Sequence, residues 1–148
     1  MQIASYLMFE GCCREAFTAY ETILGGTIEA MMTYAEMPPD AGPAPEKPDL
    51  VMHACLKLGG QRLMASDAPP GQSEGPMRSV SVYVGVRTIP EAERIFAALS
   101  ERGTVQMPLG ETFWAPRFGM LRDRFGTSWM ISAEPEQACL PDAQGIER

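Results

Sequence analysis

Histidine is almost absent from this sequence, because His53 is its only copy among 148 residues. A metal site that needs several histidines from one chain is therefore excluded. Cysteine is sparse as well, and Cys12, Cys13, Cys55 and Cys139 form neither a C-x-x-C motif nor a zinc-binding spacing. We expect free thiols and hence a cytoplasmic protein, because the cytosol keeps cysteines reduced.

Positive charge is also in short supply. The sequence has 12 Lys and Arg against 19 Asp and Glu, a formal net charge of −7, and its basic residues form no cluster. Nucleic acids and anionic membrane surfaces are therefore disfavoured as partners. No apolar run approaches the roughly 20 residues that span a bilayer, and the N-terminus soon turns polar, so we expect no membrane span and no signal peptide.

The overall composition is that of an ordinary globular protein, with 45% hydrophobic and 21% charged residues. A chain of this length most simply forms one domain, which we place at residues 1–133. Two stretches rich in proline and polar residues, 38–48 and 67–76, are predicted as loops. Residues 134–148 have no usable periodicity and are predicted to form a loosely held tail.

The first half of the chain alternates between strand and helix patterns. Residues Cys12–Leu24 repeat apolar side chains with helical spacing, and Gly25-Gly26 ends the pattern. Residues with a two-residue alternation or a strand-like composition flank this helix. The strands predicted there are Gln2–Phe9, Thr27–Tyr34, Val51–Leu58 and Gln61–Ser66.

The second half of the chain follows the same order. Arg78–Val86 alternates valines with small or polar residues, and Thr88-Ile-Pro-Glu91 is a capping box that opens a helix with Ala92, Ile95, Phe96 and Leu99 on its buried side. Gly103 ends this helix, and a short strand is predicted at Thr104–Met107. A hairpin follows, with strands Arg117–Arg122 and Thr127–Ser132 around the turn Asp123–Gly126.

These patterns form an internal repeat. Ala4–Phe9 corresponds to Ser81–Val86, 77 residues later, and Leu63–Ser66 corresponds to Trp129–Ser132, 66 residues later. Each half therefore has the order βαβββ, with modules at about 2–66 and 77–133. We predict an α+β fold in which tandem βαβββ modules share a concave mixed sheet, with the helices on its outer face.

The alternation assigns the strand residues to two faces. One face would pack on the helices and carries the valines at 80–86, Leu7, Phe9, Leu63, Trp129 and Ile131. The other would line a concave surface with Tyr6, Met8, Met64, Ser79, Ser81, Tyr83, Ser128 and Met130, and His53 is a further candidate. Such surfaces are typical of small-molecule sites, although a second subunit or the loop at 37–49 could cover this one instead.

Several strings then resemble a known family. The tandem βαβββ order is similar to the vicinal oxygen chelate superfamily, which includes glyoxalase I, extradiol dioxygenases, and fosfomycin- and bleomycin-resistance proteins. The strings that resemble its PhnB-like branch, in order along residues 2–133, are Tyr6–Phe9 with Gly11, Tyr34–Pro38, His53-Ala54, Gly59-Gly60 with Leu63-Met64 and Asp67, Glu111–Trp114, Arg117–Gly119, and Asp123–Gly126 with Trp129-Met130.

The resemblance implies a homodimer. Some similar sequences carry a ubiquinone-pathway methyltransferase label, which we discount because this chain has no glycine-rich nucleotide-binding motif between a strand and a helix.

The metal-dependent members of the superfamily carry His or Glu on the first and last strand of each module. The repeat places those positions at Ala4 (or Ser5), Met64, Ser81 and Met130. Methionine is a soft ligand and serine is a poor one for divalent metals. We therefore expect no metal cofactor.

Other chemistry would depend on His53. It could act as a general base or anchor a ligand, or it could be a hydrogen-bonded structural residue. Glu36, Asp67 or Glu111 could supply a carboxylate, although carboxylates at such positions often cap turns. Cys55 on the same face could be a nucleophile.

Phe113 and Trp114 could form a gate over the concave face, or close a sheet edge or a dimer seam.

The sequence thus favours a binding protein that holds a small apolar or aromatic molecule, without metal. The residues expected to contact the ligand are Tyr6, Met64, Ser81, Tyr83, Trp114 and Met130. The alternative is an enzyme of lyase, isomerase or oxygenase type that uses His53 and a nearby carboxylate such as Glu111, with or without a divalent metal. In a third interpretation, side chains fill the concave face and the surface serves only assembly.

Overall fold

The computed structural model describes residues 1–43 and 46–134. The elements are β1 (Ser5–Phe9), α1 (Cys13–Leu24), β2 (Thr27–Thr33), the 3-10 turn η1 (Tyr34–Glu36), β3 (Val51–Leu58), β4 (Gln61–Asp67), β5 (Val82–Val86), α2 (Ile89–Ser100), β6 (Thr104–Gly110), β7 (Arg117–Arg122) and β8 (Ser128–Ala133). The order strand, helix and three strands occurs twice, as predicted. Apart from Glu134, the predicted tail lies outside the described residues.

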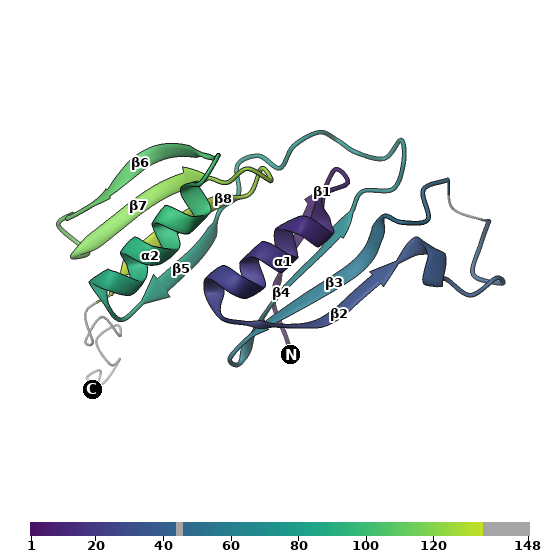
Figure 1. Ribbon diagram of the computed structural model, residues 1–148, viewed down its shortest axis with the longest axis horizontal. Helices are drawn as coiled ribbons and strands as arrows, with labels where there is room; N and C mark the ends of the chain where they lie inside the picture. Colours follow the sequence, from purple (N-terminus) through teal and green to yellow (C-terminus); the bar gives the residue numbers. More distant parts are fainter. Residues whose placement is uncertain (44–45, 135–148) are drawn as a thin grey trace, which may run out of the picture.

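The strands form two four-stranded mixed sheets, in the orders β1-β4-β3-β2 and β5-β8-β7-β6. In each sheet the first strand of the module pairs in parallel with the fourth, β1 with β4 and β5 with β8, and the other neighbouring strands are antiparallel. Figure 1 shows α1 and α2 on the same side of their sheets, with module 1 (β1 to β4) beside module 2 (β5 to β8). The predicted fold class is confirmed, but β1 and β5 each pair along one edge only, so the described strands do not join into one hydrogen-bonded sheet.

Each helix has the boundaries that its sequence favours. The α1 helix ends at Gly25, whose φ of 73° is the left-handed conformation that glycine adopts without strain. At the start of α2, the side chain of Thr88 accepts a hydrogen bond from the backbone N–H of Glu91. The buried residues of α2 are Ala92, Ile95 and Leu99, as predicted, and Phe96 is half-buried against the core.

The strand predicted at Arg78–Val86 begins only at Val82. Ser79 has a φ of 56°, which interrupts extended backbone, and the partner strand β8 pairs with β5 from Val82 onward. Val80 is therefore exposed and does not pack on the helices, whereas Val82, Val84 and Val86 contact the core as predicted.

The strand predicted at Thr104–Met107 is longer than expected and reaches Gly110 through Pro108. Proline lacks the N–H that a central strand must donate, but β6 is an edge strand and its register with β7 shifts between Met107 and Gly110. An edge position with such an irregularity accommodates proline.

The two modules meet through α1 and the β7–β8 turn. Tyr20 donates its hydroxyl toward Asp123 Oδ2 at 2.5 Å and lies 2.9 Å from Thr127 Oγ1. Asp123 also accepts from Trp129 Nε1 at 2.8 Å and from the backbone N–H groups of Phe125 and Thr127. Burial next to this carboxylate raises the pKa of Tyr20 far above its usual range. The apolar core is continuous across both modules.

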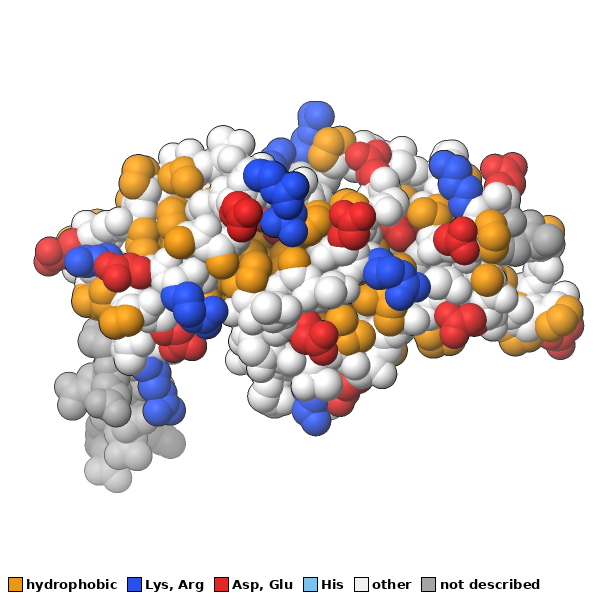
Figure 2. Space-filling view, in the orientation of Figure 1, with side chains coloured by type: hydrophobic (Ala, Val, Ile, Leu, Met, Phe, Trp, Pro, Cys, Tyr) orange, Lys and Arg blue, Asp and Glu red, His pale blue; other side chains and the backbone are white. Residues whose placement is uncertain are grey.

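The helix side of the molecule is mixed in character. Figure 2 shows charged side chains of both signs spread over this side, with hydrophobic side chains between them. Neither described helix is long and apolar enough to cross a bilayer.

Candidate functional site

The faces of the two sheets that point away from the helices carry most of the predicted ligand-binding residues. Strand alternation turns Leu7 and Leu63 into the core, so Tyr6 and Met64, which are direct neighbours on β1 and β4, face outward. Tyr83 and Met130 are the same kind of neighbours on β5 and β8. We call these surfaces the open faces of module 1 and module 2.

The open face of module 1 centres on Tyr6 and His53. The Tyr6 hydroxyl lies 3.1 Å from His53 Nδ1, and the two rings stack with centroids 5.9 Å apart. Tyr6 is 46% exposed. Met32 lies beside His53 on β2, and Cys55 lies beside Met64. This arrangement can hold a flat molecule against an aromatic and thioether surface, and it gives His53 a hydroxyl partner.

The open face of module 2 centres on Tyr83, which is 52% exposed. Its hydroxyl donates to the carboxylate of Glu134. Partial burial and this carboxylate raise the pKa of Tyr83 above its ordinary value. Ser81 lies half-buried just before β5, and Met120 lies beside Met130 on β7.

The loop after β6 extends the open face of module 2 with aromatic rings. Trp114 packs against Phe118 of β7 with centroids 5.4 Å apart, and Phe113 packs edge-on against Trp114 at 4.6 Å. Phe113 is 97% exposed. Glu111 lies exposed at the start of this loop. The loop therefore continues from the end of the sheet and exposes its aromatic side chains to solvent.

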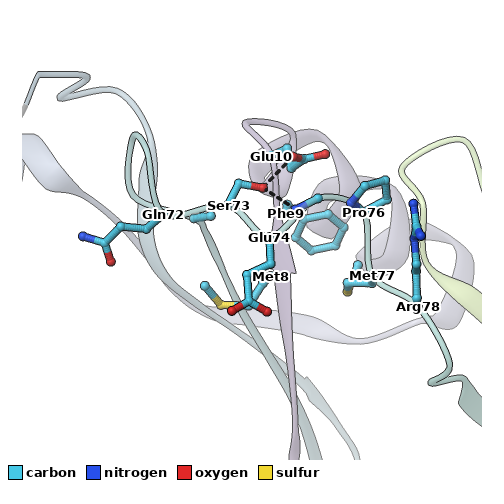
Figure 3. A pocket seen from close by; sticks show the side chains of 11 residues that line it. Met8, Phe9, Glu10, Gln72, Ser73, Glu74, Pro76, Met77 and Arg78 are labelled. Atoms are coloured by element: carbon cyan, nitrogen blue, oxygen red, sulfur yellow. Dashed lines mark hydrogen bonds between the residues drawn. The ribbon is translucent and has the colours of Figure 1, made fainter.

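Two hollows border these faces. A groove of about 720 Å³ lies between β5 and the β3–β4 hairpin, and Ser81, Tyr83 and Glu134 line it. A second hollow of about 570 Å³ lies between the end of β1 and the linker 68–78, where the Ser73 hydroxyl donates to Glu10 at 2.5 Å (Figure 3). Met8, an open-face residue, reaches into this second hollow (Figure 3). Both volumes are in the range of small-molecule sites.

The carboxylates considered as partners of His53 have other roles in the structure. Asp67 is buried and accepts hydrogen bonds from the backbone N–H groups of Gly11, Cys13 and Val51. Glu36 accepts from the backbone N–H of Thr33 at 2.6 Å, which lowers the pKa of Glu36. These two residues therefore support local structure, as carboxylates at turns commonly do.

The thiols are poorly placed for chemistry. Burial raises the pKa of Cys13 to about 12, and burial with nearby carboxylates raises the pKa of Cys12 as well. Cys55 is free and buried beneath the open face of module 1. Cys139 lies outside the described residues.

The repeat assigns the superfamily's metal-ligand positions to Ala4 (or Ser5), Met64, Ser81 and Met130. Within residues 1–43 and 46–134, no three His, Cys, Asp or Glu side chains gather closely enough to hold a metal ion. The donors on the open faces are mainly thioethers and hydroxyls, which do not fit a hard divalent cation, and the one imidazole (His53) and one carboxylate (Glu134) lie on different modules.

Several open-face residues were not among the predicted ones, namely Met32, Phe118, Met120, Arg122 and Glu134. The alternation of β7, in which Phe118, Met120 and Arg122 alternate with Gly119 and Leu121, could have indicated three of them. Glu134 follows the last strand, where no pattern marks its position.

The predicted site residues thus form two groups. Tyr6, His53 and Met64 lie together on module 1, whereas Ser81, Tyr83 and Met130 lie together on module 2. Trp114 joins the second group through Phe118. Within the described residues the two groups stand on separate sheets.

The family follows from a comparison with known proteins. Residues 1–132 match the model of the family described as 3-demethylubiquinone-9 3-methyltransferase. The chain belongs to this PhnB-like family. The relationship also explains the repeated βαβββ order, because the fold is that of the vicinal oxygen chelate superfamily.

Individual relatives support this assignment. Protein PA1353 from Pseudomonas aeruginosa is 48% identical, with a TM-score of 0.85 over 92% of this chain and 99% of that chain. The PhnB protein from Bacillus cereus, titled a putative 3-demethylubiquinone-9 3-methyltransferase, is 30% identical, with a TM-score of 0.75 over 90% and 99%. Protein YjdN from Escherichia coli is 31% identical over 93% of this chain and 98% of its own length. A glyoxalase-related enzyme from Fulvimarina pelagi, 16% identical with a TM-score of 0.54 over 90% and 89%, shares the fold alone.

Proposed function

We propose that this protein binds a small apolar or aromatic molecule against its open sheet faces and does so without a metal cofactor. The observation that carries the proposal is the repeated tyrosine–methionine pair. Tyr6 with Met64 and Tyr83 with Met130 occupy the same positions in the two modules. Both tyrosines are about half exposed, and an exposed apolar surface shared by neighbouring residues is typical of a ligand or partner site.

The chemistry of these pairs suits flat apolar ligands. Tyrosine supplies a large rigid ring, and methionine adapts its shape and makes favourable sulfur–aromatic contacts. The hydroxyls of Tyr6 and Tyr83 each have a partner, His53 and Glu134 respectively, so both rings are held in place before a ligand arrives. Such preorganisation lowers the entropic cost of binding.

A second copy of the chain would complete the site, so we propose a cytoplasmic homodimer. Tyr6, Met8, Met32 and Tyr83 leave apolar surface open on the sheets, and Phe113 and Trp114 leave more on the adjacent loop. An opposing subunit that covers these faces would turn two shallow surfaces into one enclosed cavity.

A fluorescence titration with phenylnaphthylamine, a neutral aromatic dye that brightens when it leaves water, tests the proposal. We expect saturable binding, weakened about fivefold by Met64→Gln or Met130→Gln, since each removes about 1 kcal/mol of apolar contact. Met37→Gln is the matched control, because Met37 follows η1 outside both sheets. Absence of binding, or equal loss in all three variants, would refute the proposal.

A second candidate function is an enzyme in which His53 transfers a proton with Tyr6 as its partner. The 3.1 Å contact between Tyr6 and His53 favours it, since a partner that orients the ring is what a histidine base requires. His53→Ala separates the two functions. In a binding protein the dye still binds, with a modest loss of affinity because Tyr6 loses its partner, whereas an enzyme loses turnover of any compound that the wild type consumes in a mass-spectrometric screen.

Methyl transfer, the activity in the family's description, receives little support from the geometry. After β1 the chain continues through Glu10, Gly11 and Cys12 rather than a glycine-rich phosphate loop, and both sheets are mixed rather than doubly wound.

A metal titration tests the proposed absence of a metal cofactor: Ni²⁺, Zn²⁺, Mn²⁺ and Mg²⁺ should leave the melting temperature unchanged. A shift that His53→Ala removes would favour the metal-dependent enzyme instead.

A further inference from the structure

We infer that module 2 selects ligands that carry an anionic group, which Arg122 binds at one end of the open face. This inference rests on the proposed function, because it names the chemical class of the molecule held there. Arg122 lies opposite Ser128 on β8 and Thr104 on β6. Ser81 directly precedes Val82, which pairs with Trp129 of β8, so Ser81 lies at the end of the strand where Ser128 is located. One guanidinium and three hydroxyls therefore follow one another across the sheet, a typical set of donors for an anion.

The charge of Arg122 is not compensated within the described residues. No described carboxylate forms an ion pair with it, and its Nε is buried without a hydrogen-bond partner. The neighbouring Asp123 is directed into the core, where Tyr20 and Trp129 donate to it. An anion at the outer edge of the guanidinium would therefore balance a charge that residues 1–43 and 46–134 leave unbalanced.

Module 1 provides an internal comparison. Its corresponding neighbours are Lys57 on β3 and Arg62 on β4, and both form ion pairs with Glu29, at 3.5 and 3.0 Å. Thr27 lies opposite Lys57 as Thr104 lies opposite Arg122, so the residue that corresponds to Glu29 is Gln106. The position of the carboxylate that neutralises Lys57 and Arg62 in module 1 therefore holds an uncharged amide in module 2.

The adjacent residues define the rest of the ligand. Next to the donors, one step further along the strands, Met120, Met130 and Tyr83 form an apolar strip. Glu134 approaches Gly85 at the far side of Tyr83, which is roughly 13 Å from the level of Arg122 measured along the strands at 3.3 Å per residue. Its negative charge disfavours an anion there. The ligand is therefore an aromatic or apolar acid whose carboxylate, sulfonate or phosphate points to Arg122.

Two dyes that differ in one group test this inference. Anilinonaphthalene sulfonate carries an acid group that phenylnaphthylamine lacks. The wild type should bind the sulfonate about tenfold more tightly than the neutral dye, the size expected for a partly exposed charged hydrogen bond. Arg122→Met should abolish this preference, because it weakens binding of the sulfonate far more than binding of phenylnaphthylamine. Gln106→Glu should also abolish it, because the new carboxylate would pair with Arg122 as Glu29 pairs with Lys57.

Arg117→Met is the matched control. Arg117 lies on the same strand, but its side chain lies 3.8 Å from Glu93 of α2 on the helix side, so the preference should persist. A wild type that does not prefer the sulfonate, or a preference that Arg122→Met leaves intact or Arg117→Met removes equally, overturns the inference. Phenylnaphthylamine binding reports on the proposed function separately: neutral dye bound without a preference overturns only the anion site, and no binding of either dye overturns both.

Discussion

Tyr20 connects the two modules through the hydrogen bonds of its hydroxyl group. It lies on α1 of module 1, yet its hydroxyl reaches Asp123 and Thr127 in module 2. Asp123 is buried, and a buried carboxylate is costly unless several donors satisfy it. The chain supplies two side-chain donors and two backbone donors. The contact therefore connects the modules through a group that neither module could bury alone.

Replacing this hydroxyl should destabilise the whole molecule. Tyr20→Phe keeps the ring and removes one donor to a buried carboxylate, so we expect the free energy of unfolding to fall by about 1–3 kcal/mol. Urea denaturation followed by circular dichroism measures it. Tyr34→Phe, which removes the hydroxyl of a half-buried tyrosine near η1, should cost much less. Equal losses in the two variants would contradict the role given to Asp123.

The thiols give a second prediction at this scale. A raised pKa means less thiolate at a given pH, and thiolate is the species that reacts. In a variant with Cys55→Ser and Cys139→Ser at pH 8, Cys12 and Cys13 should react with Ellman's reagent at least about tenfold more slowly in the native than in the denatured protein. The native rate should rise as the pH increases. A native rate close to the denatured one would show that these thiols are neither buried nor shifted.

At the scale of the elements, the sequence indicated most of the architecture because alternation and capping are local. The Thr88 cap, the Gly25 stop and the two-residue alternation of Thr127–Ser132 all correspond to observed features. The predicted strand boundaries were wrong where pairing with a strand distant in the sequence determines the backbone structure. Val80 continues the valine alternation but has no partner strand, and Pro108 is tolerated because β6 is at an edge.

The close approach of β7 to its neighbours gives a prediction for an element. A Cβ on Gly119 would lie 2.7 Å from a ring atom of Phe96 and 2.9 Å from the Cα of Leu109, whereas a Cβ on Gly60 would meet nothing within 4 Å. Gly119→Ala should therefore lower the free energy of unfolding by about 1–3 kcal/mol. Gly60→Ala should change it little. Chemical denaturation of both variants checks this, and a neutral Gly119→Ala would mean that α2 and β6 are less closely packed on β7.

The candidate site was only partly accessible from the sequence. The repeat correctly turned Tyr6, Met64, Tyr83 and Met130 to the same side of the sheets, because a period of two fixes the face of every strand residue. The hydrogen-bond partners of these residues could not be predicted from the sequence. The Tyr6–His53 contact depends on the pairing of β1, β4 and β3, and the position of Glu134 depends on how the chain leaves β8.

At the scale of the whole molecule, the two modules share a core but leave their open faces uncovered. We therefore expect a sedimentation mass of twice 16.2 kDa at micromolar concentration. Tyr6→Lys should weaken the dimer because it places a charge on an apolar face, and Thr18→Lys, exposed on the helix side, should not. A wild type that sediments as a monomer would contradict the proposed assembly.

The most direct test of the binding function is a nuclear magnetic resonance titration of isotope-labelled methionine methyl groups with phenylnaphthylamine. The account predicts that the signals of Met64, Met120 and Met130 shift first and saturate together, while that of Met37 stays in place. Shifts confined to methionines off the sheet faces, or no shift at dye saturation, would contradict the claim that the open faces are the binding site.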